Sequence, residues 1–181
     1  MVTIIKQGTN ETTQVVSPVT YCVNDVATPL TATVNSGSPV NWYTQAVGGT
    51  GSAIAPTPST TTAGNSQVFY AAAVDTNGCE GPRAQIAVQV NELPTATILG
   101  TTTICEGSTA TITFNGTPDA IVTYTVNSGS NQTITLDATG TATLTTSALT
   151  ANASYDLVSV LSTGTNPCSQ AQTGNALVTI E

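Results

Sequence analysis

Apolar and polar residues alternate with a period of two along most of this chain. Between Thr109 and Phe114, the side chains of Ala110, Ile112 and Phe114 point one way and three threonines point the other. This alternation is typical of a strand with one buried face. The same reasoning predicts strands at 29–34, 40–43, 68–74, 85–90, 109–114, 122–126, 134–136, 142–144, 155–161 and 176–180.

Turn-forming residues separate these predicted strands. Examples are Asn35-Ser36-Gly37-Ser38-Pro39, Asp75-Thr76-Asn77-Gly78 and Asn127-Ser128-Gly129. No stretch of useful length shows the period of about 3.6 residues that marks an amphipathic helix. Short strands at regular intervals with turns between them are typical of a β-sandwich, so the sequence predicts an all-β protein.

Each half of the chain repeats one plan, in which a cysteine is followed by an aromatic residue and then by a second cysteine. The residues are Cys22, Trp42 and Cys79 in the first half and Cys105, Tyr124 and Cys168 in the second. The aromatic residue follows the first cysteine by 20 and 19 positions, and the second cysteine follows it by 57 and 63. The repeat predicts two domains in tandem.

The sequence predicts the domain boundaries as follows. Asn91-Glu92-Leu93-Pro94 is the connection, which gives domains at 18–92 and 93–181. Residues 1–17, with a β-like run from Val2 to Lys6, are either a leading strand of the first domain or the end of a preceding module. Pro94 stiffens the connection.

Four cysteines allow three pairings, and the repeat selects one disulfide within each domain, Cys22 with Cys79 and Cys105 with Cys168. The chain has no histidine and no Cys-x-x-Cys pair, which argues against zinc. Disulfides imply an oxidising location outside the cytoplasm. Because Cys22 precedes the strand at 29–34 and Cys79 follows a turn, we expect their bond to clamp one end of the first domain.

Charged residues make up 7% of the 181 residues, against roughly a quarter in ordinary soluble domains. The formal net charge is −8, with Lys6 and Arg83 as the two basic residues, and this balance argues against nucleic acid and against anionic membrane surfaces as partners. No run approaches the ~18 apolar residues of a membrane span, and the N-terminus lacks a signal-peptide layout. We therefore expect an internal fragment of a longer exported polypeptide.

The residue types argue against an enzyme. Without histidine, the Ser-His-Asp and Cys-His arrangements cannot be built, and the ten acidic residues show no paired-carboxylate pattern. The sequence predicts no cofactor and no metal.

A calcium site is the alternative that stays open. Asp75-x-Asn77-Gly78 has the first ligands of a calcium loop but lacks the completing glutamate, and a hairpin turn accounts for the same residues. Calcium held between domains by Asp25, Glu92 or Glu106 is a further hypothesis.

The first domain resembles the immunoglobulin-like domains that occur in tandem in large secreted surface proteins of Bacteroidetes, including gliding-motility adhesins. The matching segments are Tyr21-Cys22, Pro29-Leu30-Thr31-Ala32, Asn41-Trp42-Tyr43, Gly48-Gly49, Phe69-Tyr70 and Asp75-Thr76-Asn77-Gly78-Cys79-Glu80. The second domain looks like a companion type from such proteins. Its matching segments are Thr103-Ile104-Cys105-Glu106-Gly107, Thr109 to Phe114, Asn115-Gly116-Thr117-Pro118, Val122-Thr123-Tyr124 and Asn166-Pro167-Cys168.

The resemblance implies two immunoglobulin-like β-sandwiches, exported by the type IX secretion system and displayed outside the cell. It favours Trp42 and Tyr124 as core aromatics. It also favours Tyr43 on an outer face, where its ring could contact a sugar.

The expected function is therefore a non-catalytic stalk, spacer and adhesion segment of a cell-surface adhesin. The expected partners are neighbouring immunoglobulin-like modules of the same polypeptide, with a surface polysaccharide or another surface protein as a further candidate. Two alternatives stay open: a glycan- or surface-binding module, and accessory domains of a secreted multidomain enzyme.

Overall fold

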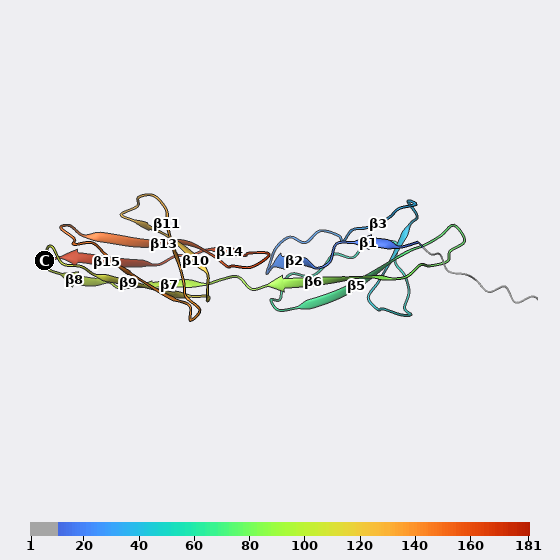
Figure 1. Cartoon of the computed structure of the whole chain (residues 1–181), viewed down its shortest axis with the longest axis horizontal. Coiled ribbons are helices and arrows are strands. Elements are labelled where there is room, and N and C mark those ends of the chain that lie inside the picture. The colour runs from blue at the N-terminus through green and yellow to red at the C-terminus, as the bar shows by residue number, and fades with distance from the viewer. Residues whose placement is uncertain (1–10) are drawn as a thin grey trace, which may run out of the picture. The chain divides into compact units, whose positions relative to one another are not determined.

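A computed structural model describes residues 11–181, and the β-like run from Val2 to Lys6 lies outside this range. The chain divides into two compact units, unit 1 ending at Glu92 and unit 2 beginning at Leu93. Every regular element between residues 11 and 181 is a strand, which confirms the all-β prediction (Figure 1). That part of the chain accordingly contains no helix long and apolar enough to cross a membrane.

Unit 1 is a four-stranded sheet faced by a two-stranded one. Its strands are β1 (Thr13–Val15), β2 (Val19–Cys22), β3 (Ala32–Val34), β4 (Val40–Tyr43), β5 (Ser66–Ala73) and β6 (Ala84–Asn91). The larger sheet has the order β2-β6-β5-β4, and β1 pairs with β3 in the smaller sheet. The β1–β3 sheet is too small to cover the whole inner face of its partner, so loops complete the second layer.

The core of unit 1 is small. Its buried cluster consists of Leu30, Trp42, Ala71, Ile86 and Val88, with Phe69 and Tyr21 among the half-buried side chains around it. Trp42 pairs with Ala71 across β4 and β5, which puts both side chains on the inner face of the sheet.

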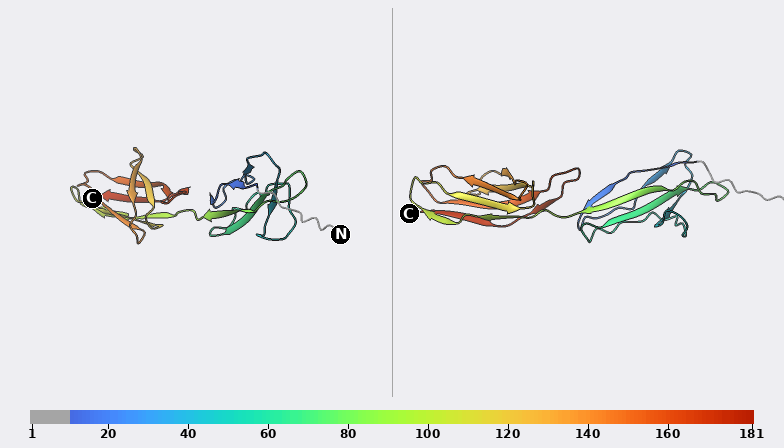
Figure 2. Two further views of the ribbon diagram at one scale, coloured as in Figure 1. Left: turned by 45° about the vertical axis from the view of Figure 1, so that its right-hand side comes forward. Right: turned by 60° about the horizontal axis from the view of Figure 1, so that its bottom comes forward.

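Unit 2 has two larger sheets. Its strands are β7 (Ala96–Leu99), β8 (Thr102–Ile104), β9 (Thr111–Gly116), β10 (Ile121–Val126), β11 (Gln132–Thr135), β12 (Thr141–Thr145), β13 (Ala153–Leu161), β14 (Ser169–Ala171) and β15 (Asn175–Ile180). One sheet has the order β11-β10-β13-β15-β8 with β14 also paired to β13, and the other has the order β12-β9-β7. Figure 2 shows the strands of each unit running along that unit's length.

The core of unit 2 holds fifteen buried residues between these sheets. The side chain of Phe114 is fully buried, and its ring centroid lies 5.0 Å from that of Tyr124 in a tilted arrangement. The alternation predicted for 109–114 is observed, since Ile112 and Phe114 are buried and Thr111 is exposed.

Both units begin in the same way. The first segment of each pairs with one sheet and then crosses to the other, where it runs parallel to the last strand. In unit 1 these pairs are β1 with β3 and then β2 with β6, and in unit 2 they are β7 with β9 and then β8 with β15. The chain consequently enters each unit at one end, here called the upstream end, and leaves at the other, the downstream end.

Hydrogen bonds mark the two ends of unit 1. Near the upstream end, the Thr13 hydroxyl accepts a bond from the backbone N–H of Ala73. At the downstream end, the Val23 N–H donates to the carbonyl of Asn91, the last residue of β6. The eight residues of β6 separate these ends by about 25 Å.

Unit 2 has the same polarity. At its upstream end the Thr117 N–H donates to the Thr95 carbonyl, and at its downstream end the Glu181 N–H donates to the Ile104 carbonyl. The nine residues of β13 lie along this direction and span about 30 Å.

The predicted disulfide between Cys22 and Cys79 is wrong. Cys22 is disulfide-bonded, but Cys79 is a buried free thiol. Cys22 pairs with Asn91 at the downstream end of unit 1, whereas Cys79 lies at the upstream end, where the Gly81 N–H donates to the Ala73 carbonyl. About 25 Å of β6 therefore separates two cysteines whose Cα atoms would have to lie within about 7 Å.

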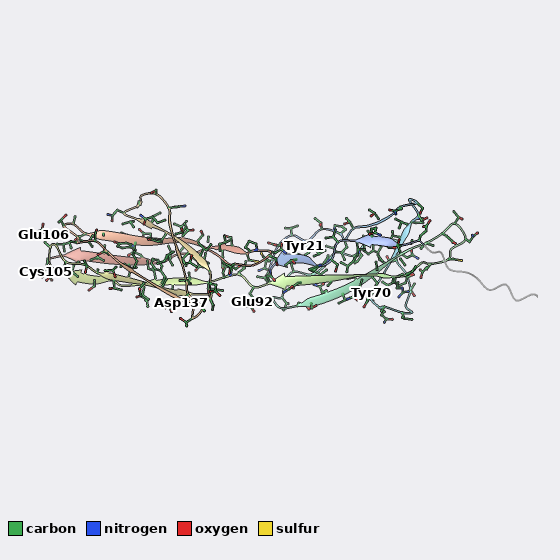
Figure 3. The ribbon with its side chains drawn as sticks, viewed as in Figure 1. Tyr21, Tyr70, Glu92, Cys105, Glu106 and Asp137 are labelled. Atoms are coloured by element: carbon green, nitrogen blue, oxygen red, sulfur yellow. The ribbon has the colours of Figure 1, made fainter. Side chains whose placement is uncertain are left out.

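The predicted disulfide between Cys105 and Cys168 is wrong for the same reason. Cys168 is disulfide-bonded and Cys105 is an exposed free thiol. The Cys168 N–H donates to the Ser162 hydroxyl at the upstream end of unit 2, while Cys105 follows Ile104 at the downstream end. Figure 3 shows Cys105 beside Glu106 at that end of unit 2 and Asp137 toward the opposite end.

The free thiols can be counted directly. In the unreduced native protein, a thiol reagent such as Ellman's reagent should react rapidly with one cysteine, the exposed Cys105. After unfolding in denaturant it should react with a second, the buried Cys79. Finding no reactive thiol in the unfolded, unreduced protein would contradict the structure and restore the two intradomain bonds.

Candidate functional site

The Tyr43 ring is covered. Tyr43 is 6% exposed, and the Arg83 guanidinium lies 3.3 Å from the centroid of its ring, a cation–π contact. Gly51 also packs closely against Tyr43, since a β-carbon added at Gly51 would lie 2.5 Å from the Tyr43 hydroxyl oxygen. The expectation of an outer-face Tyr43 open to a sugar is therefore not met.

Arg83 also fixes the loop that follows Tyr43. Its Nη1 atom donates to the carbonyl oxygens of Gln45 and Gly48, at 2.7 and 2.8 Å. Its Nη2 atom lies 3.9 Å from the Glu80 carboxylate, which in turn accepts a hydrogen bond from the Asn41 amide. A single cation thus bonds to two carbonyl oxygens of the loop between Thr44 and Gly51.

Behind this loop lies a hollow, which we call the Phe69 hollow. It has a volume of about 440 Å³ and is lined by Trp42, Tyr43, Thr44, Thr50, Ser52, Ile54, Ala55, Pro56 and Phe69. It lies between the strands β4 and β5 and the segment from Thr50 to Pro56. Phe69, on β5, is half-buried and packs against the core cluster of unit 1.

Sequence reasoning did not find the Phe69 hollow. The segment from Gly48 to Gly64 is rich in Gly, Ser, Thr and Pro, and it contains an isolated bridge in which Ser52 pairs with Trp42. The presence of Ile54 and Ala55 within a polar stretch was the one available signal.

The other aromatic residues of the repeat lie in the cores. Trp42 is 7% exposed and Tyr124 is 4% exposed. The Tyr124 hydroxyl donates to the Gln132 side chain, and burial raises the pKa of the Tyr124 phenol. Burial also raises the pKa of Tyr155, with a smaller contribution from Tyr124.

The acidic residues considered for calcium form turns or lie apart. The Asp75 carboxylate accepts bonds from the N–H groups of Asn77 and Cys79, which makes the predicted turn. The Asp25 carboxylate accepts from the Cys22 N–H, and Glu106 lies at the downstream end of unit 2. Within residues 11–181, no group of three or more acidic or cysteine side chains is placed to hold a metal ion.

Asp137 closes a turn between β11 and β12. Its carboxylate accepts bonds from the Thr139 hydroxyl and from the N–H groups of Thr139 and Thr141. The Thr139 hydroxyl contributes most, followed by the backbone bonds, and together they lower the Asp137 pKa in the folded protein.

This lowered pKa predicts a pH dependence. Because the folded pKa of Asp137 lies below its unfolded value, the carboxylate stabilises unit 2 at neutral pH, and this contribution disappears as the pH falls through the folded pKa. Asp137→Asn should therefore lower the urea midpoint of unit 2 at pH 7, and the difference from wild type should shrink toward pH 3. Glu106→Gln, which removes another exposed carboxylate, is the control. Equal differences at both pH values would contradict the assignment.

Comparison with known proteins identifies the fold. Residues 11–91, and so most of unit 1, match the sequence model of a family described as Ig-like domain CHU_C associated. The fold is immunoglobulin-like. A search of curated protein sequences finds no significant match.

Among solved structures, the chain is similar to three N-terminal domains of the highly immunogenic outer capsid protein (Hoc) of bacteriophage RB49. The identity is 11% and the TM-score 0.51, over 95% of this chain and 70% of that one. Fibronectin(III)-like modules of Clostridium thermocellum CbhA share 16% identity, with a TM-score of 0.47 over 94% of each chain. The D00-D0 domain of intimin shares 14% identity, with a TM-score of 0.40 over 93% of this chain and 98% of that one.

Proposed function

We propose that the two immunoglobulin-like units are non-catalytic spacer and adhesion modules of a large secreted bacterial cell-surface protein. The observation that carries this proposal is that the chain enters and leaves each unit at opposite ends. A unit built in this way adds its long dimension, about 25 to 30 Å of strand, to the reach of the polypeptide. The family match of residues 11–91 supports the same kind of module.

The pairing of the terminal strands also suits a spacer. In each unit the last strand runs parallel to an early one. In unit 1 β6 pairs with β2, and in unit 2 β15 pairs with β8. A force that separates the two ends of a unit slides these strands past each other, so it loads their backbone hydrogen bonds together. Such pairing resists extension of the chain along the strands.

The proposal can be tested by exchanging the modules in the parent protein. Both units would be replaced by an unrelated pair of β-sandwich domains of similar length, and adhesion of the producing cells would be measured. Retained adhesion is expected of a spacer. Loss of adhesion, with surface display unchanged, would show that the units themselves take part in recognition. Unchanged adhesion after both units are deleted without replacement would contradict the spacer role.

Surface display is tested separately. Antibodies raised against this chain should label intact, unpermeabilised cells of the organism that produces it. Labelling that requires permeabilisation would contradict the proposed location.

A further inference from the structure

We propose that the Phe69 hollow of unit 1 binds an uncharged sugar residue of a polysaccharide. This inference rests on the adhesion role proposed above and supplies a site for it. The hollow lies within unit 1, and its volume of about 440 Å³ falls in the range of small-molecule sites.

The lining suits the two faces of a sugar ring. Phe69, with Trp42 beside it, offers an aromatic surface to the apolar face of a pyranose. Thr44, Thr50 and Ser52 are exposed at the rim, so threonine hydroxyls and nearby backbone groups can exchange hydrogen bonds with sugar hydroxyls.

Charge narrows the ligand further. Tyr43 is the only ionisable side chain among the lining residues, so the hollow offers no opposite charge to a carboxylate, a sulfate or an ammonium group. The formal net charge of −8 on the chain also disfavours acidic polysaccharides. An uncharged hexose or pentose unit is compatible both with the uncharged lining of the hollow and with the negative net charge of the chain.

The walls of the hollow are held in place without a ligand. Trp42 and Ser52 exchange two backbone hydrogen bonds, of 2.8 and 3.0 Å, and the Leu30 N–H donates to the Pro56 carbonyl. The Ser52 hydroxyl is engaged by Ile54 through backbone bonds of 3.0 and 3.2 Å. Together with the Arg83 contacts to the preceding loop, these bonds reduce the ordering that a ligand would otherwise have to impose.

A matched pair of substitutions isolates the hollow from the rest of the surface. Ile54 is 80% exposed and lines the hollow, whereas Val47 is 86% exposed and does not. Ile54→Lys and Val47→Lys thus place the same new side chain at two exposed aliphatic positions, with little effect expected on folding. Thr50→Val, which removes a rim hydroxyl, is paired in the same way with Thr57→Val outside the hollow.

The probes are neutral oligosaccharides of glucose, xylose, mannose and N-acetylglucosamine, with oligogalacturonate as an acidic comparison, first on an array and then by titration calorimetry. At least one neutral sugar should bind the full chain. Its affinity should fall about tenfold in Ile54→Lys and about fivefold in Thr50→Val, and stay unchanged in Val47→Lys and Thr57→Val.

Three outcomes would overturn the proposal: no neutral sugar binds at millimolar concentration, the acidic oligosaccharide binds better than the neutral ones, or both members of each matched pair behave alike. Circular dichroism and urea unfolding of each variant serve as the control that the fold is kept. A negative result leaves the spacer role standing, because the module exchange tests that role without reference to a sugar.

Discussion

Replacing Trp42 with alanine is expected to unfold unit 1 at denaturant concentrations that leave unit 2 folded. Trp42 is the largest member of a cluster of only five buried residues, and it links the two layers of unit 1. Truncating a buried tryptophan costs about 3–5 kcal/mol, which is a large part of the ~5–15 kcal/mol that stabilises a typical domain. The second layer of unit 1, which is mostly loops, has little apolar surface with which to compensate.

Hydrogen exchange followed by mass spectrometry measures this effect. It does not depend on tryptophan fluorescence, which the substitution of Trp42 removes. Peptides from β4, β5 and β6 should lose protection in Trp42→Ala, while peptides from β9, β10 and β13 keep theirs. Trp42→Phe is the control, since it retains a ring in the core and should cost less. Unchanged protection in unit 1 of the alanine variant would show that Trp42 does not hold its core together.

Replacing Phe114 with alanine is the corresponding experiment in unit 2. Phe114 is fully buried at the centre of a cluster of fifteen residues, and its ring packs against that of Tyr124. We expect a loss of about 3–5 kcal/mol from the removed surface and the cavity, with about 0.5–1.5 kcal/mol more from the aromatic pair. Unit 2 should still fold in water, because fourteen buried partners remain.

The urea midpoint of unit 2 measures this loss, followed by hydrogen exchange of β9 and β10. Phe114→Leu keeps most of the apolar volume and should recover about half of the lost stability. A loss of less than about 1 kcal/mol in Phe114→Ala would contradict the central position of this ring, because it would mean that the cavity collapses without cost.

Strands with regular alternation could be predicted from the sequence, and those without it could not. The segments around Ile112, Val122 and Ile86 were predicted because their side chains alternate between core and solvent. The strands β1, β2, β7, β8 and β14 were not predicted. Each has three or four residues and is defined by pairing with a distant partner, which leaves little local pattern to recognise.

The cysteine pairing shows a different limit. The similar spacings of Cys22 and Cys79 and of Cys105 and Cys168, 57 and 63 positions, predicted two modules with one plan. The spacing did not indicate the distance between the cysteines in space, because the two cysteines of each pair lie at opposite ends of a sheet. Only the register of the strands reveals this separation.

The sequence by itself determined the all-β class and the turns, since each depends on residue types within a few positions of one another. The tertiary structure decided which cysteines can meet, that the Tyr43 ring is covered by Arg83, and that the Phe69 hollow forms between β4, β5 and the segment from Thr50 to Pro56. Those features depend on which strands become neighbours and how far each layer extends. Contacts between residues tens of positions apart fix both, and no local pattern encodes them.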